Sequence, residues 1–285
     1  MNMILIADSG STKTDWACVS PDGSRVIRFR SQGYNPNYIS KEDISADVKK
    51  NLSEGFPTDE VTEIDFYGAG VTELQYPLMR KALQAVFKNA TTANIAMDTL
   101  ASARALLGHK SGFAAILGTG TNTCLYDGEN QTLNIDSLGF ILGDEGSGAY
   151  LGKRMICDFI RGDMPKDVSK IVAEKLGKNG DELIDQIYTR PFPNRYCAQF
   201  APFIKENMPK YPYFNDLVED AFRAFFQDIV SHYPDYRKYK FNCVGSIGYY
   251  FRDILESVAK DFGMDVDVIL QAPMEGLIKY HTGQF

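Results

Sequence analysis

Two short polar loops, each directly after an apolar run, constrain this chain more than any other feature of its sequence. The first is residues 8–14, DSGSTKT, which follows residues 3–7, and the second is residues 118–122, GTGTN, which follows residues 113–117. Another apolar, strand-like run comes after each loop. A tight turn of Gly, Ser and Thr between two strands presents backbone N–H groups and small hydroxyls, which suits phosphate oxygens. Because the two loops are alike, they predict one phosphate chain held between two halves of the molecule.

The loops differ from the commoner phosphate motifs. The chain contains no Gly-x4-Gly-Lys-Ser/Thr, and no Gly-x-Gly-x-x-Gly opens a helix after a strand. A Gly-Thr-Gly turn by itself is most often an ordinary hairpin, and Lys13 by itself suits a solvated turn. The phosphate interpretation therefore depends on the two loops together, with the aspartate and lysine of the first.

The composition argues against several kinds of partner. The chain has 285 residues and a formal net charge of −7. An acidic chain is a poor match for a nucleic-acid backbone, and no apolar run approaches the length of a membrane span. The five cysteines contain no Cys-x-x-Cys pair, the three histidines are far apart, and the first residues do not resemble a secretory leader. We therefore expect a cytoplasmic protein that binds neither nucleic acid nor membranes.

Strands alternate with helices along the chain, which is typical of α/β domains. In the first half the residue pattern predicts strands at 3–8, 15–20, 25–31, 63–67 and 93–97 and helices at 41–52, 76–87 and 100–107. The pattern restarts at residue 112, with strands at 112–117, 124–126, 133–138, 240–244 and 266–270 and helices at 149–160, 168–176, 181–188, 194–208, 215–232, 250–260 and 274–281. We therefore predict two domains, 1–111 and 112–273, with the segment 274–285 packing back on the first.

The two loops resemble the two phosphate motifs of the actin/hexokinase/Hsp70 ATPase superfamily, and residues 244–248, VGSIG, resemble its adenosine motif. Residues 142–148, LGDEGSG, and 98–103, DTLASA, are most similar to the BadF/BadG/BcrA/BcrD-type ATPase family, which includes N-acetylglucosamine kinase. The resemblance spans the whole chain. It implies two ribonuclease H-like (actin-like ATPase) domains of the α/β class with a cleft between them, and ATP and Mg²⁺ as cofactors.

The resemblance also implies roles for individual residues. Asp98 would be the catalytic carboxylate that accepts the proton of the sugar hydroxyl, and Asp8 would face Mg²⁺ through water. At Gly245 a larger side chain would block the adenosine. The nucleotide and its phosphates would contact Asp8, Gly10, Ser11, Thr12, Lys13, Gly118, Thr119, Gly120, Thr121, Gly245 and Ser246. The sugar would contact Asn35, Asn122, Gly139 and Asp144.

Several of these residues also suit ordinary structural roles. Asp98 could cap the helix that follows it, and Asn35 before a proline is a common turn residue. Asp144 and Glu145 precede a helix, whose dipole stabilises acidic side chains at its start. We favour a sugar contact for Asp144 and leave the role of Glu145 open. Sugar kinases of this family often carry Gly-Gly-Trp-Gly before the GDEGS segment, whereas this chain has SLGFIL at 137–142. That difference leaves the preference for an N-acetyl group open.

We therefore predict an ATP-dependent carbohydrate kinase that phosphorylates a small amino sugar, with N-acetylglucosamine the first candidate. Two alternatives stay open. One is an ATPase that activates an iron–sulfur dehydratase, which needs exposed thiols that Cys157 and Cys197 would have to supply. The other is a sugar- or nucleotide-binding regulator without turnover. A homodimer is left open as well.

Overall fold

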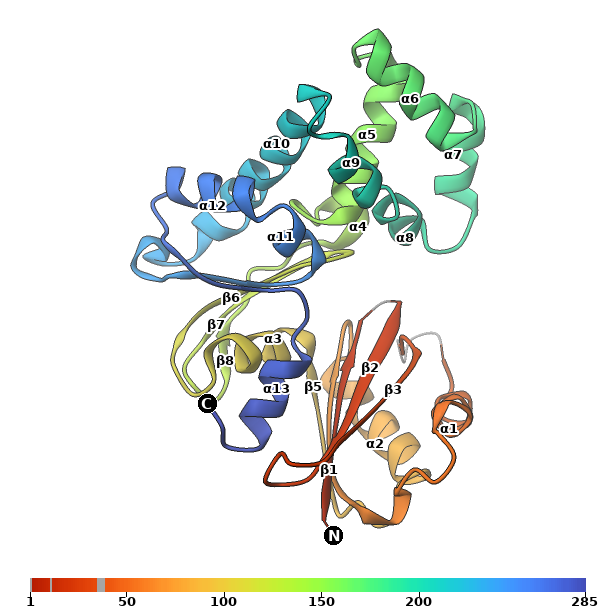
Figure 1. Cartoon of the computed structure of the whole chain (residues 1–285), viewed down its shortest axis with the longest axis vertical. Helices are drawn as coiled ribbons and strands as arrows, with labels where there is room; N and C mark the ends of the chain where they lie inside the picture. Colours follow the sequence, from red (N-terminus) through yellow and green to blue (C-terminus); the bar gives the residue numbers. More distant parts are fainter. Residues whose placement is uncertain (1, 11, 35–38) are drawn as a thin grey trace. The chain divides into compact units, whose positions relative to one another are not determined.

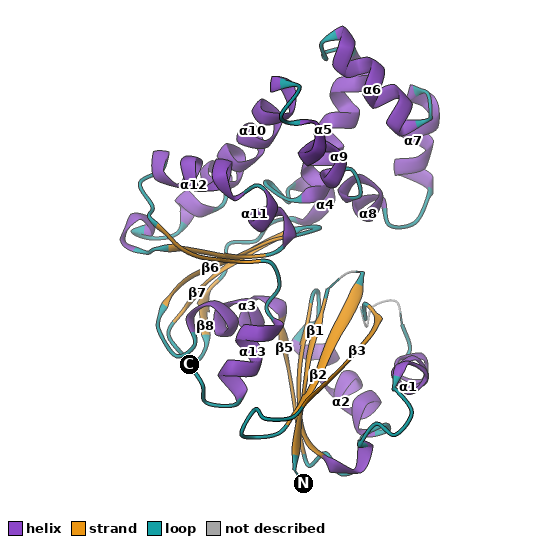
Figure 2. Cartoon of the chain, in the orientation of Figure 1, coloured by secondary structure: helices purple, strands orange, loops and turns teal. Residues whose placement is uncertain are grey.

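The computed structural model describes residues 2–10, 12–34 and 39–285. Two of the predicted site residues, Ser11 and Asn35, lie outside the described residues. Two five-stranded sheets carry the helices, as Figure 1 and Figure 2 show, and the predicted α/β class is confirmed. Within the described ranges, no helix is both long and apolar enough to cross a bilayer.

The chain divides into two compact units. Unit 1 consists of Met1–Ala114, Leu125–Thr132 and Ala272–Phe285, and unit 2 consists of Ala115–Cys124 and Leu133–Gln271. The last segment of the chain therefore belongs to unit 1.

Unit 1 is built on a sheet of both parallel and antiparallel strands. Its strands are β1 (Met3–Ser9), β2 (Lys13–Val19), β3 (Val26–Gln32), β4 (Val61–Gly68) and β5 (Thr92–Met97). They lie in the order β3-β2-β1-β4-β5, with β1–β2 and β2–β3 antiparallel and β1–β4 and β4–β5 parallel. The helices of this unit are α1 (Lys41–Asn51), η1 (Thr58–Glu60), η2 (Glu73–Gln75), α2 (Tyr76–Gln84), α3 (Asp98–Leu107) and α13 (Met274–His281).

Successive side chains of a strand point to opposite faces of a sheet, and this sheet has a buried cluster on each face. Trp16 and Phe66 belong to a cluster that includes residues of α1 and α2. Their neighbours Ala17 and Tyr67 belong to a second cluster with residues of α3 and α13. Helices on both faces leave the strand ends as the accessible part of such a sheet, and ligands bind there in open α/β sheets.

A buried polar network fixes α3 and α13 on β4. The Arg104 guanidinium of α3 donates to the Tyr67 hydroxyl at 2.7 Å, and that hydroxyl lies 2.9 Å from Nε2 of His281 on α13. Burial and the nearby Arg104 lower the pKa of His281 to about 4, so its imidazole is neutral at pH 7. The network holds the helix whose first residue is Asp98.

The remaining helices belong with the second sheet. Its strands are β6 (Gly112–Leu117), β7 (Thr121–Tyr126), β8 (Gln131–Leu133), β9 (Phe241–Val244) and β10 (Val266–Leu270), in the order β10-β9-β6-β7-β8. The helices are α4 (Gly139–Leu142), α5 (Gly148–Arg161), α6 (Lys166–Leu176), α7 (Gly180–Thr189), α8 (Pro193–Ala198), α9 (Ala201–Asn207), α10 (Pro212–Asp228), η3 (Val230–His232), η4 (Tyr236–Lys238), α11 (Ser246–Tyr250) and α12 (Arg252–Asp261).

The predicted strand at 133–138 is wrong, since β8 ends at Leu133. Side chains replace the hydrogen bonds that a strand would make with its neighbour. Asn134 donates its side-chain N–H to the carbonyl of Thr123 at 2.6 Å, and the backbone N–H of Ile135 donates to the Tyr233 hydroxyl at 2.9 Å.

Three helix predictions in this half also need correction. The helix predicted at 194–208 is two helices, α8 and α9, because Pro202 has no backbone N–H and fits only the first turn of a new helix. The helix predicted at 215–232 begins earlier, at Pro212, and α10 ends at Asp228 before a short 3-10 helix. Helix α11 begins at Ser246, within the segment 244–248 that resembles the adenosine motif, so the helix predicted at 250–260 is α11 followed by α12.

Candidate active site

Asp8 and Asp98 lie near the carboxyl ends of two parallel strands, β1 and β5, which flank β4 on either side. The register pairs Ser9 of β1 with Gly68 of β4, and Gly68 with Met97 of β5, so the three strands end at the same level. Asp8 is one residue before the end of β1, and Asp98 directly follows β5. The two predicted acidic residues are thus carried to one edge of the sheet.

The environment of Asp8 disfavours its charged form. Burial, the negative charge of Asp98 and that of Asp15 together raise the pKa of Asp8 to about 7, whereas Lys13 acts to lower it. Asp15 is directly opposite Asp8 on β2, so the two side chains share a face of the sheet. Sequence reasoning missed Asp15, although residues 8 and 15 are equally distant from the centre of the predicted hairpin turn.

The structure places Lys13 on Asp15. The Lys13 ammonium lies 2.5 Å from one carboxylate oxygen of Asp15, and Nε of Arg30 lies 2.6 Å from the other. Within the loop, the Gly10 N–H donates to the Lys13 carbonyl at 3.0 Å, and the Thr12 carbonyl accepts from the Gly33 N–H at 3.1 Å. The Lys13 side chain is 53% exposed, so its contact with Asp15 is an exchangeable surface ion pair.

The residues around Asp8 fit a hydrated magnesium ion better than a closed metal cage. Among the described residues, no group of three His, Cys, Asp or Glu side chains could hold a metal ion. Mg²⁺ usually keeps several waters and takes one or two carboxylates plus substrate phosphates. A carboxylate whose pKa is raised by burial and by two negative neighbours is stabilised by such a cation, so Asp8 fits this role.

Asp98 does not occupy the N-cap position that a role as a helix cap would require. Helix α3 begins at Asp98 itself, and its N-cap residue is Met97, which makes no side-chain cap. Asp98 is therefore an acidic residue in the first helical turn, where the helix dipole favours its negative charge.

The second polar loop is fixed to the start of α5. The Gly118 and Thr119 carbonyls accept hydrogen bonds from the backbone N–H groups of Gly148 and Ala149, at 2.9 Å and 3.0 Å. The Gly118 N–H donates to the Gly120 carbonyl at 3.0 Å, which closes the turn. The predicted phosphate residues of this loop are therefore held in one backbone conformation.

Asp144 lies beneath this loop and binds it directly. Its Oδ1 accepts from the Thr121 N–H at 3.1 Å and from the Ser137 hydroxyl at 3.3 Å. A Cβ at Gly120 would lie only 3.0 Å from its Oδ2, so the glycine permits the close approach. The backbone of Asp144 has φ of +60°, an uncommon conformation for a residue with a side chain, which is consistent with a position held for function.

The remaining predicted sugar residues near Asp144 have varied surroundings. Asn122 uses its side-chain oxygen to accept from Asn134 at 2.9 Å. Gly139 is the exposed first residue of α4, with φ of +67°. Glu145 is half-buried, burial raises its pKa, and its backbone carbonyl accepts from the Thr121 hydroxyl at 2.7 Å. The backbone of Glu145 therefore helps to hold the loop 118–122 in place.

The packing of unit 2 requires a glycine at position 245. It has φ of +130°, and a Cβ there would lie 2.2 Å from the Leu117 carbonyl oxygen. A larger side chain there would first collide with the backbone of β6, and the expectation that it would block the adenosine stays a prediction. Ser246 is the exposed first residue of α11.

We expect Gly245→Ala to lower the free energy of unfolding by about 2–4 kcal/mol, because the methyl group adds both a clash and backbone strain. Chemical denaturation monitored by circular dichroism would measure this loss. Gly118→Ala is the matched control, since a Cβ there meets no atom within 4 Å. Equal stability of the two variants would contradict the packing explanation.

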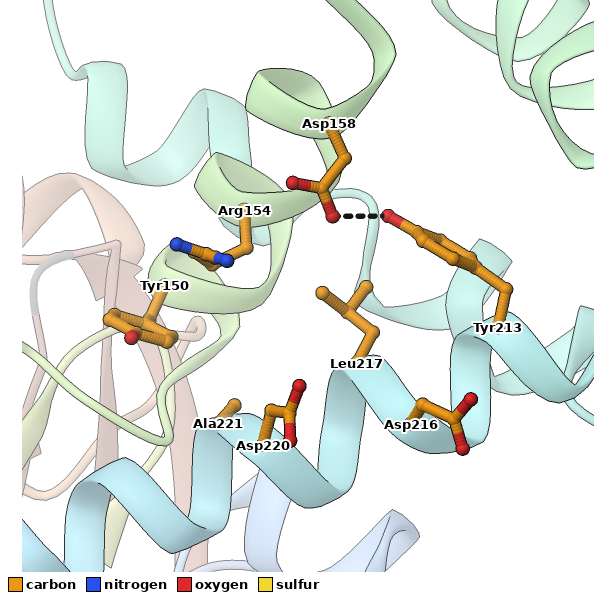
Figure 3. A pocket seen from close by; sticks show the side chains of 8 residues that line it. All are labelled: Tyr150, Arg154, Asp158, Tyr213, Asp216, Leu217, Asp220 and Ala221. Carbon is orange, nitrogen blue, oxygen red and sulfur yellow. Dashed lines mark hydrogen bonds between the residues drawn. The ribbon is translucent and has the colours of Figure 1, made fainter. Parts of the chain in front are cut away.

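A separate cavity of about 300 Å³ lies between α5 and α10 (Figure 3). Three carboxylates and one arginine line it, and the Tyr213 hydroxyl donates to Asp158 at 2.8 Å. The excess of negative charge disfavours a nucleotide phosphate, and none of the predicted site residues lines this cavity. Its lining is Tyr150, Arg154, Asp158, Tyr213, Asp216, Leu217, Asp220 and Ala221.

Comparisons with known proteins give the chain a family. No family model matches it, and no curated protein matches it. A solved structure from Porphyromonas gingivalis, described as a "putative N-acetylglucosamine kinase", is 37% identical, covers 99% of both chains and superimposes with a TM-score of 0.93. The chain belongs to this N-acetylglucosamine kinase-like family.

Two more distant structures show the same fold. A protein from Chromobacterium violaceum with the same description as the Porphyromonas one is 16% identical over 99% of both chains, with a TM-score of 0.75. A ROK family glucokinase from Streptomyces griseus, solved with glucose and AMPPNP, is 14% identical over 99% of this chain and 98% of its own, with a TM-score of 0.50. The predicted two-domain, actin-like sugar kinase fold of the N-acetylglucosamine kinase-like protein is thus confirmed. None of these descriptions names the BadF/BadG/BcrA/BcrD branch, which stays a prediction from the motifs.

Proposed function

We propose that this N-acetylglucosamine kinase-like protein transfers the γ-phosphoryl group of ATP to a hydroxyl of a small amino sugar, with N-acetylglucosamine the first candidate. The observation that carries the proposal is the pair Asp8 and Asp98 at one strand edge, where the charge of Asp98 raises the pKa of Asp8. Full-length similarity to a protein described as an N-acetylglucosamine kinase supports the choice of sugar.

In this proposal Asp98 accepts the proton of the attacking hydroxyl and Asp8 orients the hydrated Mg²⁺. The ion would neutralise charge on the phosphates that the two loops bind. The loop residues supply backbone N–H groups and hydroxyls, and Lys13 can leave the exposed Asp15 contact for a phosphate oxygen. Gly245 and Ser246 would adjoin the adenosine. Positioning of the substrates and neutralisation of the phosphate charge then supply most of the rate enhancement.

For the sugar, Asn35, Asn122, Gly139 and Asp144 are the proposed contacts. The Oδ1 of Asp144 is used by Thr121 and Ser137. Among the described residues its Oδ2 accepts no hydrogen bond, so this oxygen is the one that a sugar hydroxyl would bind. Asp144 would then join the sugar to the phosphate loop through a single carboxylate.

We expect Asp144→Asn to raise the KM for the sugar by about tenfold to a hundredfold, since a hydrogen bond to a charged group contributes about 1.5–3 kcal/mol. The KM for ATP should change little, because the Asn oxygen can still accept from Thr121. Steady-state kinetics with each substrate varied in turn measures both. Ser137→Ala, which removes one donor to Oδ1, is the control for loosening the loop. An unchanged sugar KM with a lower melting temperature would leave Asp144 a structural role alone.

The cysteines do not favour the dehydratase activator. All five lie within the described residues; Cys18, Cys124, Cys197 and Cys243 are buried and Cys157 is half-buried. Burial raises the pKa of Cys197 to about 12, which opposes the thiolate form that an iron–sulfur cluster needs.

An ADP-release screen tests the kinase proposal. The full chain with Mg-ATP is offered glucosamine, N-acetylglucosamine, muramic acid derivatives, glucose and mannose in separate reactions. Release that depends on one amino sugar supports the proposal. Binding of sugar and ATP by calorimetry without any ADP release would instead support the regulator.

A further inference from the structure

Helix α4 stands out because burial of apolar side chains does not hold it in place. Leu138, Ile141 and Leu142 are 58%, 84% and 74% exposed. The helix has only four residues, which is too short for stability by itself, and its N-cap residue Leu138 has φ of +58° and makes no side-chain cap. Other contacts must therefore fix this segment.

The base of the segment is closed by Asp144, the proposed sugar carboxylate. The Asp144 N–H donates to the Ser137 carbonyl at 2.9 Å, and the Ser137 hydroxyl donates to Asp144 Oδ1 at 3.3 Å. Gly143 permits this closure, because a Cβ there would collide with the Ser137 carbonyl oxygen and would lie 3.2 Å from Oε2 of Glu145. A displacement of α4 would therefore also move Asp144.

Lys153 of α5 holds the middle of the segment. It is half-buried, and its ammonium donates to the Phe140 carbonyl at 2.7 Å. The same ammonium lies 5.1 Å from the centre of the Phe140 ring and 5.5 Å from that of Tyr150, within the range of a cation–π interaction. Within the described residues, no other hydrogen bond joins residues 139–142 to a part of the chain outside 137–144. Figure 1 shows α4 beside α5.

Lys153 also supplies a positive charge near two carboxylates. Burial raises the pKa of both Asp144 and Glu145. The negative charge of Asp136 acts in the same direction on the first of these, and that of Asp228 on the second. Lys153 opposes this effect at both, and so favours the ionised carboxylates that accept hydrogen bonds from hydroxyl groups.

We propose that Lys153 is a positioning residue of the sugar site, which ties Phe140 to α5 and so keeps α4 and the Asp144 carboxylate where a sugar hydroxyl binds. This inference rests on the proposed kinase function, because that function gives Asp144 a sugar to bind. Loss of the tie should weaken sugar binding and leave nucleotide binding nearly unchanged, since backbone hydrogen bonds fix the loop 118–122 to the start of α5. The alternative is an ordinary surface lysine whose stem covers apolar groups.

Steady-state kinetics of Lys153→Met, which keeps the length of the side chain but lacks the donor and the charge, tests this role. The KM for N-acetylglucosamine should rise about tenfold, as when a hydrogen bond to a charged group is lost, and the KM for ATP should change little. Lys153→Arg keeps a donor and the charge and should restore most of the sugar affinity. Lys175→Met is the matched control, because Lys175 is an exposed lysine of α6 whose ammonium also lies near a ring, 5.8 Å from the centre of that of Phe203. An equal rise in both KM values would indicate a structural role alone and overturn the proposal.

Hydrogen exchange of the ligand-free protein tests the tie without any activity. The Gly143 N–H donates to the Gly139 carbonyl at 2.8 Å, so the amides of residues 139–144 should exchange faster in Lys153→Met and at the wild-type rate in Lys175→Met. Unchanged exchange in Lys153→Met would overturn the proposal, and so would faster exchange with an unchanged KM for N-acetylglucosamine. A wild-type protein that releases no ADP with any sugar would instead overturn the kinase proposal, and the exchange rates would still decide whether Lys153 holds α4.

Discussion

Replacing Asp98 by Asn should lower kcat by about 10²–10⁴-fold, the usual loss when a general base is removed. Asn keeps the shape of the side chain but lacks the basic oxygen that would accept the hydroxyl proton. Binding of ATP and sugar should change little. Because α3 takes its N-cap from Met97, the melting temperature should fall only slightly.

The same variant should also affect Asp8. The charge of Asp98 is the largest neighbouring-charge contribution to the raised pKa of Asp8, so its removal should bring that pKa down toward the ordinary range. Single-turnover kinetics and a pH series of melting temperatures measure the two effects. Glu73→Gln, a change of an exposed carboxylate in the same unit, is the control. Wild-type turnover in Asp98→Asn would reject Asp98 as the base.

Asp8→Asn should make the ligand-free protein more stable at pH 8, by as much as about 4 kcal/mol, while raising the Mg²⁺ requirement about tenfold or more. The native pKa of Asp8 is about 7, against 3.8 for the free side chain, so the native state holds its proton longer than the unfolded state. Stability of the wild-type protein should therefore fall as the pH rises from about 4 to about 7, and the Asn variant should lack that fall.

Denaturation at several pH values, with and without Mg-ADP, measures this dependence. The cation should restore stability to the wild-type protein at high pH and do little for Asp8→Asn. Glu54→Gln, another exposed carboxylate of unit 1, should follow the wild-type curve. Identical pH profiles for the wild-type protein and Asp8→Asn would show that the folded protein does not raise the pKa of Asp8.

The local elements that position the site could be predicted because their signals are local. Apolar runs ending in Asp8 and Asp98 mark two strands, and the carboxyl ends of both lie at one edge of the same sheet. The pairing of Asp8 with Asp15 needs the hairpin register, and the collision at Gly245 needs the fold, since Leu117 is far away in the sequence. Neither is visible in a pattern of single residues.

The strand predicted at 133–138 fails for a reason that lies far away in the sequence. The residues 134–138 have enough apolar character for a strand, but the Asn134 side chain donates to the Thr123 carbonyl, 11 residues away, and the Ile135 N–H donates to the Tyr233 hydroxyl, 98 residues away. Such long-range hydrogen bonds override local propensity. The sugar contact expected of Asp144 stays a prediction, and the hydrogen bonds of its carboxylate to Thr121 and Ser137 become visible only in the structure.

Mass spectrometry of N-acetylglucosamine incubated with the full chain and Mg-ATP tests most directly whether this protein is an amino-sugar kinase. The sugar should gain one phosphoryl group for each ADP formed, and the product should be nearly absent with Asp98→Asn. Formation of ADP and free phosphate while every offered sugar stays unmodified would contradict the account.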